Sequence, residues 1–545
     1  MTSYHNRPFE EIKPQGQFTK KRVHIDHQDL SDLLHDEPID FLSEKVVLSE
    51  SLVVYGIWYW EYNYKAGKWI FKGLYRNGFF DLLASRGYYK RYSSDEKMVM
   101  WIKDTNGIIE EVTIAHLMDV AKDCVAQQTD IQFEHDRDIL TATAELCQEK
   151  FKAQHHLIFN ASSLLNLETH RKQFFVDTPT SAYFFYQNGI VEATADQVVV
   201  HPYNLLKDRC VWKSQVIKRV FDPEADGPNS QMALFDYNTC NGSPERLNTR
   251  RTGCGYLLHR HNSPIRNQAI ICNDEVITSA KEARGRTGKG LWFHAIAQVR
   301  SGCLLDGKGF NEEDRFCFQR VEAHHNFVCL DDPKPKLDFK RFFSLSTEGW
   351  VIERKNKLSL HIPPAESPKL LILSNTILDN EGTSNKARQF VIEFSNHYSK
   401  QIITGTEEPI RAEHGCVFFS DDWGPDEWAC FDQYMISNCQ LYLKHGLIPG
   451  DMSNVAANRL RQTAGDDFFE FVTQHDNGKG LQANTYYDST QLFGQFRTIY
   501  QFDEKELKQR GFTERLKKYG ASKGWDFQRK TGGPSGGFWY VSKAG

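Results

Sequence analysis

A glycine-rich loop that runs directly into an apolar helix is the feature that most constrains the fold of this chain. Residues 285–290 read GRTGKG, and the apolar residues of the following LWFHAIAQV have helical spacing. Such a loop can curl its backbone N–H groups around an anion, while the helix points its positive end at the same place. A short apolar strand is expected before the loop, at 269–272. The pattern therefore predicts an α/β domain that binds phosphate groups.

Different residues of this loop are expected to contact different parts of a bound triphosphate. Gly285 and Gly288 allow the tight curl, and Lys289 is the cation expected at the β- and γ-phosphates of ATP. The standard pattern has a further glycine at the position of Ala283 and a serine or threonine at the position of Gly290. The complete set predicted to contact the nucleotide is Gly285, Arg286, Thr287, Gly288, Lys289 and Gly290.

Two further apolar strands follow the loop, and each ends in polar residues. FVCL leads into Asp331 and Asp332, and KLLIL is followed closely by Asn375. One carboxylate of such a pair can hold Mg²⁺ while its neighbour polarises an attacking water, and an amide can orient that water. Arg388 lies 13 residues after Asn375, where it could reach the nucleotide of a neighbouring subunit. Each feature alone also fits a solvated loop, but their order favours a nucleotide site.

A β-hairpin is predicted between the acidic pair and the third strand. The sequence VIER-KN-KLSL places a turn at residues 355–356, with Arg354, Lys355 and Lys357 at the tip. A basic tip of this kind suits contact with nucleic-acid phosphates inside a ring. The alternative is a charged turn in solvent.

The C-terminal segment, residues 504–545, is rich in lysine and arginine. It predicts a helix followed by two strands around a glycine-rich wing, which is typical of a winged-helix module that binds DNA. Its aromatic residues argue against the alternative of a disordered, solubilising tail.

A chain of 545 residues is too long for one compact core. Residues 114–170 are expected to be largely helical, and residues 425–446 are expected to form a helix with Pro425 in its first turn. Residues 221–230 (FDPEADGPNS) are the clearest expected linker, and no internal repeat is visible. The predicted parts are a polar tail at 1–45, an α+β and helical collar or partner-docking region at 46–230, a nucleotide-binding domain at 231–400, a helical extension at 401–500 and a winged-helix-like segment at 501–545.

Composition excludes several other classes of protein. The net charge of −5 means that any nucleic-acid contact must come from local basic patches. The twelve cysteines show no CxxC spacing, which argues against a zinc ribbon. No apolar run is long enough for a transmembrane helix and no signal sequence is visible, so we expect no membrane contact and a cytoplasmic location.

The segments EARGRTGKGLW, FVCLDDPKPKLDFKRFFSLSTEGWVIERKNK, PKLLILSN and SNKARQFVIEFSNHYS resemble the superfamily 3 helicases. The resemblance is strongest to the helicase half of primase–helicase proteins from phages and mobile elements, especially those of Bacteroidetes, and runs from about residue 170 to the C-terminus. It implies a multidomain α/β and α+β chain with an AAA+-like P-loop ATPase core, an N-terminal α+β region and a C-terminal winged-helix-like domain.

The resemblance also implies an activity and a set of roles. The chain would be an ATP-dependent DNA helicase that uses Mg²⁺, assembles as a homo-hexamer and acts on single-stranded or forked DNA in a bacterial cell or phage-infected host. It would support replication of a phage, plasmid or integrated element, with room for a separate primase as partner. The implied roles are phosphate binding by Lys289, metal binding and water activation by Asp331 and Asp332, sensing by Asn375, an arginine finger at Arg388 and pore contacts at Lys355 and Lys357.

Gly290 departs from the family pattern, because a hydroxyl that binds Mg²⁺ is expected there. The metal would then rest on Asp331, water and the phosphates, or Thr287 would supply the hydroxyl. This departure keeps a second function open: an ATP-binding DNA initiator or defence NTPase whose fold serves assembly alone. A primase would need paired metal-binding carboxylates near the N-terminus, where only the HDRD at 135–138 is a candidate. A solvated helix face is the simpler interpretation of that stretch.

Overall fold

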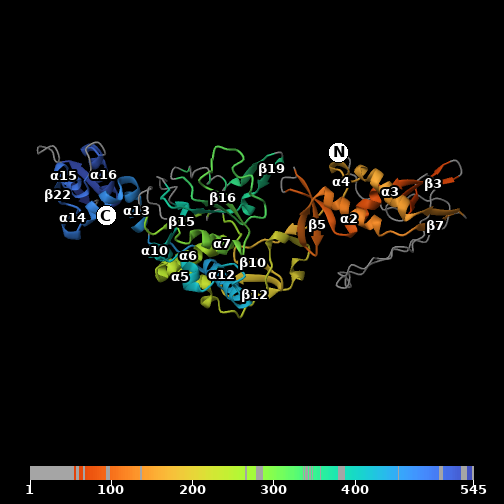
Figure 1. Ribbon diagram of the computed structural model, residues 1–545, viewed down its shortest axis with the longest axis horizontal. Coiled ribbons are helices and arrows are strands. Elements are labelled where there is room, and N and C mark those ends of the chain that lie inside the picture. The colour runs from red at the N-terminus through yellow and green to blue at the C-terminus, as the bar shows by residue number, and fades with distance from the viewer. Residues whose placement is uncertain are drawn as a thin grey trace. The chain divides into compact units, whose positions relative to one another are not determined.

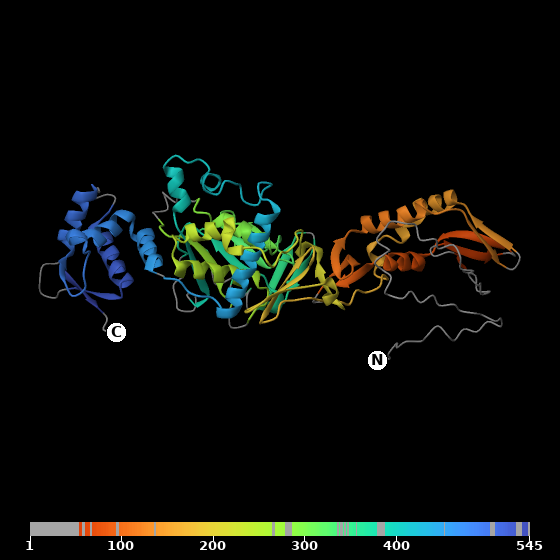
Figure 2. The same ribbon diagram turned by 90° about the horizontal axis from the view of Figure 1, so that it is seen from below.

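The computed structural model describes residues 54–56, 60–65, 68–93, 98–135, 138–263, 267–277, 286–334, 337, 342, 345, 348–355, 357–378, 387–451, 453–501, 507–529 and 537–542. The chain divides into two compact units. One comprises Met1–Tyr92 with Val99–Lys172, and the other comprises Ser93–Met98 with Gln173–Gly545 (Figures 1 and 2). The predicted polar tail at 1–45 lies outside the described residues. None of the described helices has both the length and the apolar character needed to cross a membrane.

The first unit repeats one pattern three times, a two-stranded hairpin followed directly by a helix. Thr113 and Thr143 cap the second and third helices, each accepting a bond from the backbone N–H three residues on. The repeat is not visible in the sequence, because its three copies share the order of their elements but few identical residues. The copies are β2 (Trp60–Lys65), β3 (Lys68–Leu74) and α1 (Arg76–Ser85); β5 (Val99–Thr105), β6 (Ile108–Val112) and α2 (Ile114–Ala126); β7 (Ile131–His135), β8 (Asp138–Ala142) and α3 (Ala144–Gln154).

The third hairpin corrects the expectation that residues 114–170 are largely helical. β7 and β8 pair antiparallel, with His135 opposite Asp138 at the turn. The HDRD stretch therefore lies at a hairpin tip rather than on a helix face, and its residues 136–137 lie outside the described part of the chain. The α+β character of this region is confirmed.

The second unit begins with short strands that belong to the same core as the α/β layers after them. Phe184 and Tyr186 of this segment are fully buried in one cluster with residues of the later strands and helices. The unit thus includes the chain from Gln173 onward, ahead of the predicted boundary at 231. The strands that contribute residues to this cluster are β10 (Ser181–Tyr186), β11 (Gly189–Thr194) and β14 (Val216–Ile217), and β12 (Val198–His201) packs against it. The same stretch of chain also contains β9 (Gln173–Phe174) and β13 (Arg209–Trp212).

The segment 221–230, expected to be a linker, is buried at its two ends and at Gly227. Phe221 and Ser230 are each 1% exposed. A Cβ added at Gly227 would lie 2.7 Å from the backbone nitrogen of Tyr434, so the chain approaches the neighbouring helix too closely for any side chain. Gly227, one of the residues that suggested a linker, thus allows close packing.

A five-stranded, fully parallel sheet forms the centre of this unit, in the order β16-β17-β20-β15-β21 (Figure 1). All six residues of β15 are buried, which explains its apolar run AIIC at 269–272. Because the strands are parallel, their carboxyl ends meet at one edge. The strands are β15 (Ala269–Asp274), β16 (Gly302–Asp306), β17 (Phe327–Asp331), β20 (Lys369–Leu373) and β21 (Gln389–Phe394).

Helices cover this sheet, and two sequence predictions are confirmed around it. The helix expected from Pro425 is α12 (Pro425–His445), which packs on α6. The expected hairpin is β18 (Trp350–Arg354) with β19 (Lys357–Ile362), and Arg354 lies opposite Lys357 across the turn. The other helices are α5 (Gln231–Thr239), α6 (Pro244–Leu258), α7 (Lys289–Ala297), α10 (His397–Ile403) and α11 (Pro409–His414).

The last part of the chain has its own hydrophobic core. Leu460, Phe468, Phe496, Leu516 and Tyr540 belong to one buried cluster, so the predicted boundary at 501 cuts through a single core. The predicted helix and two strands are confirmed, and the residues between the strands, 530–536, lie outside the described chain. The elements are α13 (Ser453–Ala464), α14 (Asp466–Gly478), β22 (Tyr486–Asp488), α15 (Ser489–Tyr500), α16 (Gln509–Ser522), β23 (Trp525–Arg529) and β24 (Gly537–Ser542).

A buried ion pair tests whether the early strands are integral to the second unit. Asp177 accepts hydrogen bonds from Arg300 Nη2 (3.0 Å) and from the backbone nitrogens of Arg260 (2.7 Å) and Tyr183 (2.9 Å). Replacing Asp177 by Ala leaves the Arg300 charge buried without its partner, so we expect a loss of about 3–5 kcal/mol in unfolding free energy. Urea unfolding measures this loss. Asp208→Ala, on the exposed surface, should change stability by less than about 0.5 kcal/mol. Equal stability of the two variants would contradict the shared core.

Candidate functional site

Acidic and amide side chains gather at the carboxyl edge of the parallel sheet. Asp274 ends β15, Asp306 ends β16 and Asp331 ends β17, with Asp332 directly after it. Asn375 follows β20 by two residues. Asp306 lies opposite Asp331 in the strand register, so these two carboxylates are neighbours. The carboxyl edge of an open parallel sheet is where such folds bind ligands.

Lys289 reaches this edge from the first turn of α7. Its side chain is 8% exposed, and Nζ donates to Asp274 Oδ1 and to Thr287 Oγ1, the latter at 3.2 Å. Thr287 Oγ1 in turn donates to the same Asp274 oxygen at 2.6 Å. Asp274 was missed in the sequence because the strand was expected to end at residue 272. Its position as the last residue before the long connection to the loop was the available signal.

The two glycines around Lys289 have opposite surroundings. Gly288 precedes α7 with a φ of +102°, and a Cβ there would lie 2.5 Å from the ring of Phe235. Around Gly290, by contrast, an added Cβ would meet no atom within 4 Å. A larger residue at 290 therefore has room, while 288 requires glycine. Gly285 lies outside the described residues, and Arg286 is exposed with a φ of +75°.

The acidic pair carries more negative charge than its surroundings balance. Burial, together with the negative charges of Asp332 and Asp306, raises the pKa of Asp331, although Lys289 and Lys308 act in the opposite direction. Asp332 forms an ion pair with the exposed Lys308 at 3.1 Å. Lys289 and Asp331 lie at the same edge of the sheet, and the positive charge of Lys289 acts to lower the Asp331 pKa.

Asn375 joins this group through one side of its amide. Its Nδ2 donates to Asp332 Oδ1 at 3.1 Å. Its Oδ1 is buried and has no hydrogen-bond partner among the described residues. A buried polar atom without a partner is costly, so this oxygen fits contact with a water or ligand that binds at the edge.

Arg388 lies at the other edge of the sheet. Its carbonyl accepts a bond from Ala269 N at 2.9 Å, at the amino ends of β21 and β15. β15 and β21 are each six residues long, so Arg388 at their amino ends lies roughly 17 Å from Asp274 at the carboxyl end of β15. Arg388 is therefore far from the site of its own chain, and any role at a nucleotide requires a neighbouring subunit.

The three basic residues of the hairpin do not form one exposed tip. Arg354 is 10% exposed and pairs with Glu322 at 2.6 Å, which withdraws it from solvent. Lys355 is exposed at the turn. Lys357 begins β19, and its side chain lies outside the described atoms. The partner of Arg354 lies 32 residues earlier in the chain, so sequence spacing gave no sign of it.

A metal ion at this edge would need ligands beyond the protein. Within the part of the chain that the structure describes, no three His, Cys, Asp or Glu side chains cluster closely enough to hold a metal. Mg²⁺ commonly binds through one or two carboxylates together with substrate phosphates and water. The crowded charge at Asp331 fits this mode, whereas the hydroxyl of Thr287 is already bonded to Asp274.

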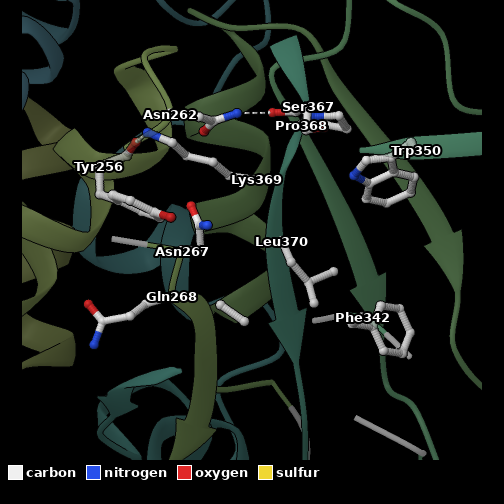
Figure 3. A pocket seen from close by; sticks show the side chains of 11 residues that line it. Tyr256, Asn262, Asn267, Gln268, Phe342, Trp350, Ser367, Pro368, Lys369 and Leu370 are labelled. Atoms are coloured by element: carbon white, nitrogen blue, oxygen red, sulfur yellow. Dashed lines mark hydrogen bonds between the residues drawn. The ribbon is translucent and has the colours of Figure 1, made fainter. Parts of the chain in front are cut away.

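Two hollows lie elsewhere. One is at the amino ends of β15 and β20, beside Tyr256, Asn267, Gln268 and Lys369 (Figure 3). Burial there lowers the pKa of Lys369 to about 7, and its Nζ donates to the carbonyls of Tyr256 and His259. This amine is thus engaged in holding the fold together. The second hollow lies on the C-terminal part and is lined by Ser489, Gln509, Arg510, Thr513, Glu514, Phe527, Arg529 and Gly537.

Substitution of the two glycines by alanine tests the geometry of the loop. Gly288→Ala forces a left-handed residue against the Phe235 ring, and we expect a loss of about 1–3 kcal/mol in unfolding free energy. Gly290→Ala should cost less than about 0.5 kcal/mol, because the space around it is open. Urea unfolding of both variants gives the comparison. Similar losses at both positions would show that the loop is placed differently.

The raised pKa of Asp331 predicts a stability effect that depends on pH. At neutral pH the folded protein carries this carboxylate at a cost that the unfolded chain lacks, so Asp331→Asn should raise the melting temperature without added nucleotide or Mg²⁺. The gain should shrink as the pH falls from 8 to 4, because the wild-type carboxyl becomes protonated. Calorimetry across this range measures it. A gain that is constant with pH, or a loss at pH 8, would contradict the charge crowding.

No protein-family model and no curated protein matches the sequence. Two solved structures of the NrS-1 C-terminal region align with most of the chain. One A-form apo structure has 11% identity and a TM-score of 0.36, covering 86% of this chain and 98% of that chain. A second, of residues 305–718, has 12% identity and a TM-score of 0.34, covering 85% and 98%. Likeness at this level carries no argument about activity, so the functional conclusion rests on the site.

Proposed function

We propose that this chain is an ATP-dependent DNA helicase or translocase with a P-loop core of the AAA+ type, related to the superfamily 3 helicases. The observation that carries the proposal is the meeting of Lys289, Asp331, Asp332 and Asn375 at one edge of a parallel sheet. Lys289 stands at a helix N-terminus, where phosphate binds most readily. The carboxylates lie across the same edge, where they would hold a divalent cation.

Each side chain has a definable task in ATP hydrolysis. Lys289 would leave Asp274 and donate to the β- and γ-phosphate oxygens, while the backbone N–H groups at the start of α7 hold the same phosphates. Asp331 would hold the Mg²⁺, and Asp332 would accept the proton of the attacking water. Asn375 already donates to Asp332 and has a free amide oxygen to orient that water. The cation, when bound, neutralises charge that develops on the phosphates.

The C-terminal part supports binding to DNA. Its chain order of helix, strand, two helices and two strands (α14, β22, α15, α16, β23 and β24) is compatible with the proposed winged-helix module. Arg510 on α16 and Arg529 on β23 are exposed beside the hollow between these elements. Such a helix with a neighbouring wing is suited to a DNA groove and its phosphates.

The position of Arg388 favours assembly into a ring within this proposal, and the resemblance to the superfamily 3 helicases implies that the ring is a hexamer. An arginine at the amino edge cannot act on the nucleotide of its own chain, but it can act on that of a neighbour in a ring. Single-stranded or forked DNA would then contact Lys355 and Lys357 in the pore. Such a motor would serve replication of a phage, plasmid or mobile element, alongside a separate primase.

The second candidate function is an ATP-binding initiator or defence protein without a motor. Two observations favour it: Gly290 supplies no hydroxyl for the metal, and Lys289 is already paired with Asp274. Nucleotide binding without turnover would support this switch over the helicase.

ATP turnover with and without single-stranded DNA tests the proposal. We expect DNA to stimulate turnover in the wild type, and Lys289→Ala to reduce it at least about 100-fold, because the cation at the phosphates is lost. Lys444→Ala, an exposed lysine with a loose ion pair at 3.8 Å, is the matched control and should retain wild-type turnover. Normal turnover in Lys289→Ala would overturn the site assignment.

A further inference from the structure

Helix α13 is bonded to the loop that leaves β15. Asn458, which is 1% exposed, accepts a bond from Ile277 N at 3.1 Å through Oδ1. Its Nδ2 donates to Glu275 O at 2.9 Å. Arg461 Nη1 donates to the same Oδ1 at 3.0 Å, which fixes the orientation of the amide. One buried side chain therefore holds the backbone immediately after Asp274, the residue that binds Lys289.

The same helix is bonded to the loop that leaves β20. Gln462 Oε1 accepts from Ile377 N at 2.7 Å, and Gln462 Nε2 donates to Ile377 O at 3.1 Å. This two-point bond has the form of a strand pairing, with an amide side chain in place of a backbone. Ile377 lies two residues after Asn375, so α13 holds both loops that carry site residues.

The opposite face of α13 belongs to the C-terminal core. Leu460 and Ala464 are four residues apart and buried in the cluster that also contains Phe468 of α14. Asn458 and Gln462 are likewise four residues apart, so they share the other face of the helix. The polar face of the helix thus contacts the loops of the sheet. Its apolar face belongs to the C-terminal module, which comprises α13 to β24.

We propose that Asn458 and Gln462 are positioning residues of the nucleotide site and that, through these two side chains, ATP binding changes the conformation of the C-terminal module. The inference rests on the proposed function. Binding of a triphosphate would draw Lys289 away from Asp274 and give Asn375 a new partner. Both changes alter the loops at the points where α13 is bonded. Because a buried amide that loses its hydrogen bonds is costly, α13 moves with these loops rather than releasing them.

Hydrogen exchange of the full-length protein tests this coupling directly. The probe is a non-hydrolysable ATP analogue with Mg²⁺, added at saturation. In the wild type, exchange should slow at 286–297 and should also change by at least about fivefold in α13 and α14. Protection at 286–297 with no change in α13 and α14 would overturn the coupling and leave the proposed function standing. No change at 286–297 would overturn the nucleotide site itself, and the coupling with it.

A double variant removes the side-chain hydrogen bonds between α13 and the two loops. In Asn458→Ala with Gln462→Ala, the response of α13 and α14 should disappear even when the analogue saturates 286–297. Gln440→Ala is the matched control, because Gln440 is also a helical amide bonded to a carbonyl, that of Thr194 at 3.1 Å, away from the site. The control should respond as the wild type does. If exchange in α13 and α14 still changes as in the wild type, then Asn458 and Gln462 do not couple the site to the C-terminal module and the proposal is wrong.

The same variants can be compared through DNA affinity. For a fluorescent forked DNA, the analogue should change the dissociation constant of the wild type and the control by about fivefold or more. The ratio of the constants with and without analogue should fall to about one in the double variant. By linkage, DNA should change the affinity for the analogue by the same factor in each protein. A double variant that keeps the wild-type ratio would overturn the role of Asn458 and Gln462.

Discussion

The parallel pairing of β15 with β20 on one side and β21 on the other is the constraint on which the rest of the second unit depends. Parallel strands bring their carboxyl ends to one edge, and the order β16-β17-β20-β15-β21 places the end of β15 two strands from the end of β17. Lys289 and Asp331, which are 42 residues apart in the chain, come to the same edge of the sheet in this way. A different strand order with the same motifs would scatter these residues.

The electrostatics of this edge are unbalanced in a manner that suits a bound metal–triphosphate. The ion pair with Asp274 balances the positive charge of the buried Lys289 side chain. Asp331 is crowded by two further carboxylates, and its charge is only partly offset. A nucleotide would satisfy Lys289 with phosphate, while its cation would relieve Asp331. The ligand-free protein bears this imbalance as a local loss of stability, as ligand sites commonly do.

Sequence patterns predicted those features that depend on neighbours along the chain. The β18–β19 hairpin, the helix from Pro425 and the C-terminal helix with its two strands were all correct, since turn residues, caps and apolar spacing specify them locally. Features set by distant contacts were missed. Glu322 neutralises Arg354, Asp274 binds Lys289, and a buried core joins residues 173–230 to the sheet. Proline and glycine at 221–230 indicated a linker because sequence cannot show that Gly227 lies against another helix.

A structure of the full-length protein with a non-hydrolysable ATP analogue and Mg²⁺ examines the central claim most directly. The account predicts the triphosphate at the N-terminus of α7, with Lys289 Nζ about 3 Å from a phosphate oxygen and no longer bonded to Asp274. The Mg²⁺ should have Asp331 as a direct or water-mediated ligand. An analogue bound at the amino edge beside Lys369, or a Lys289 that keeps Asp274 while nucleotide binds elsewhere, would contradict it.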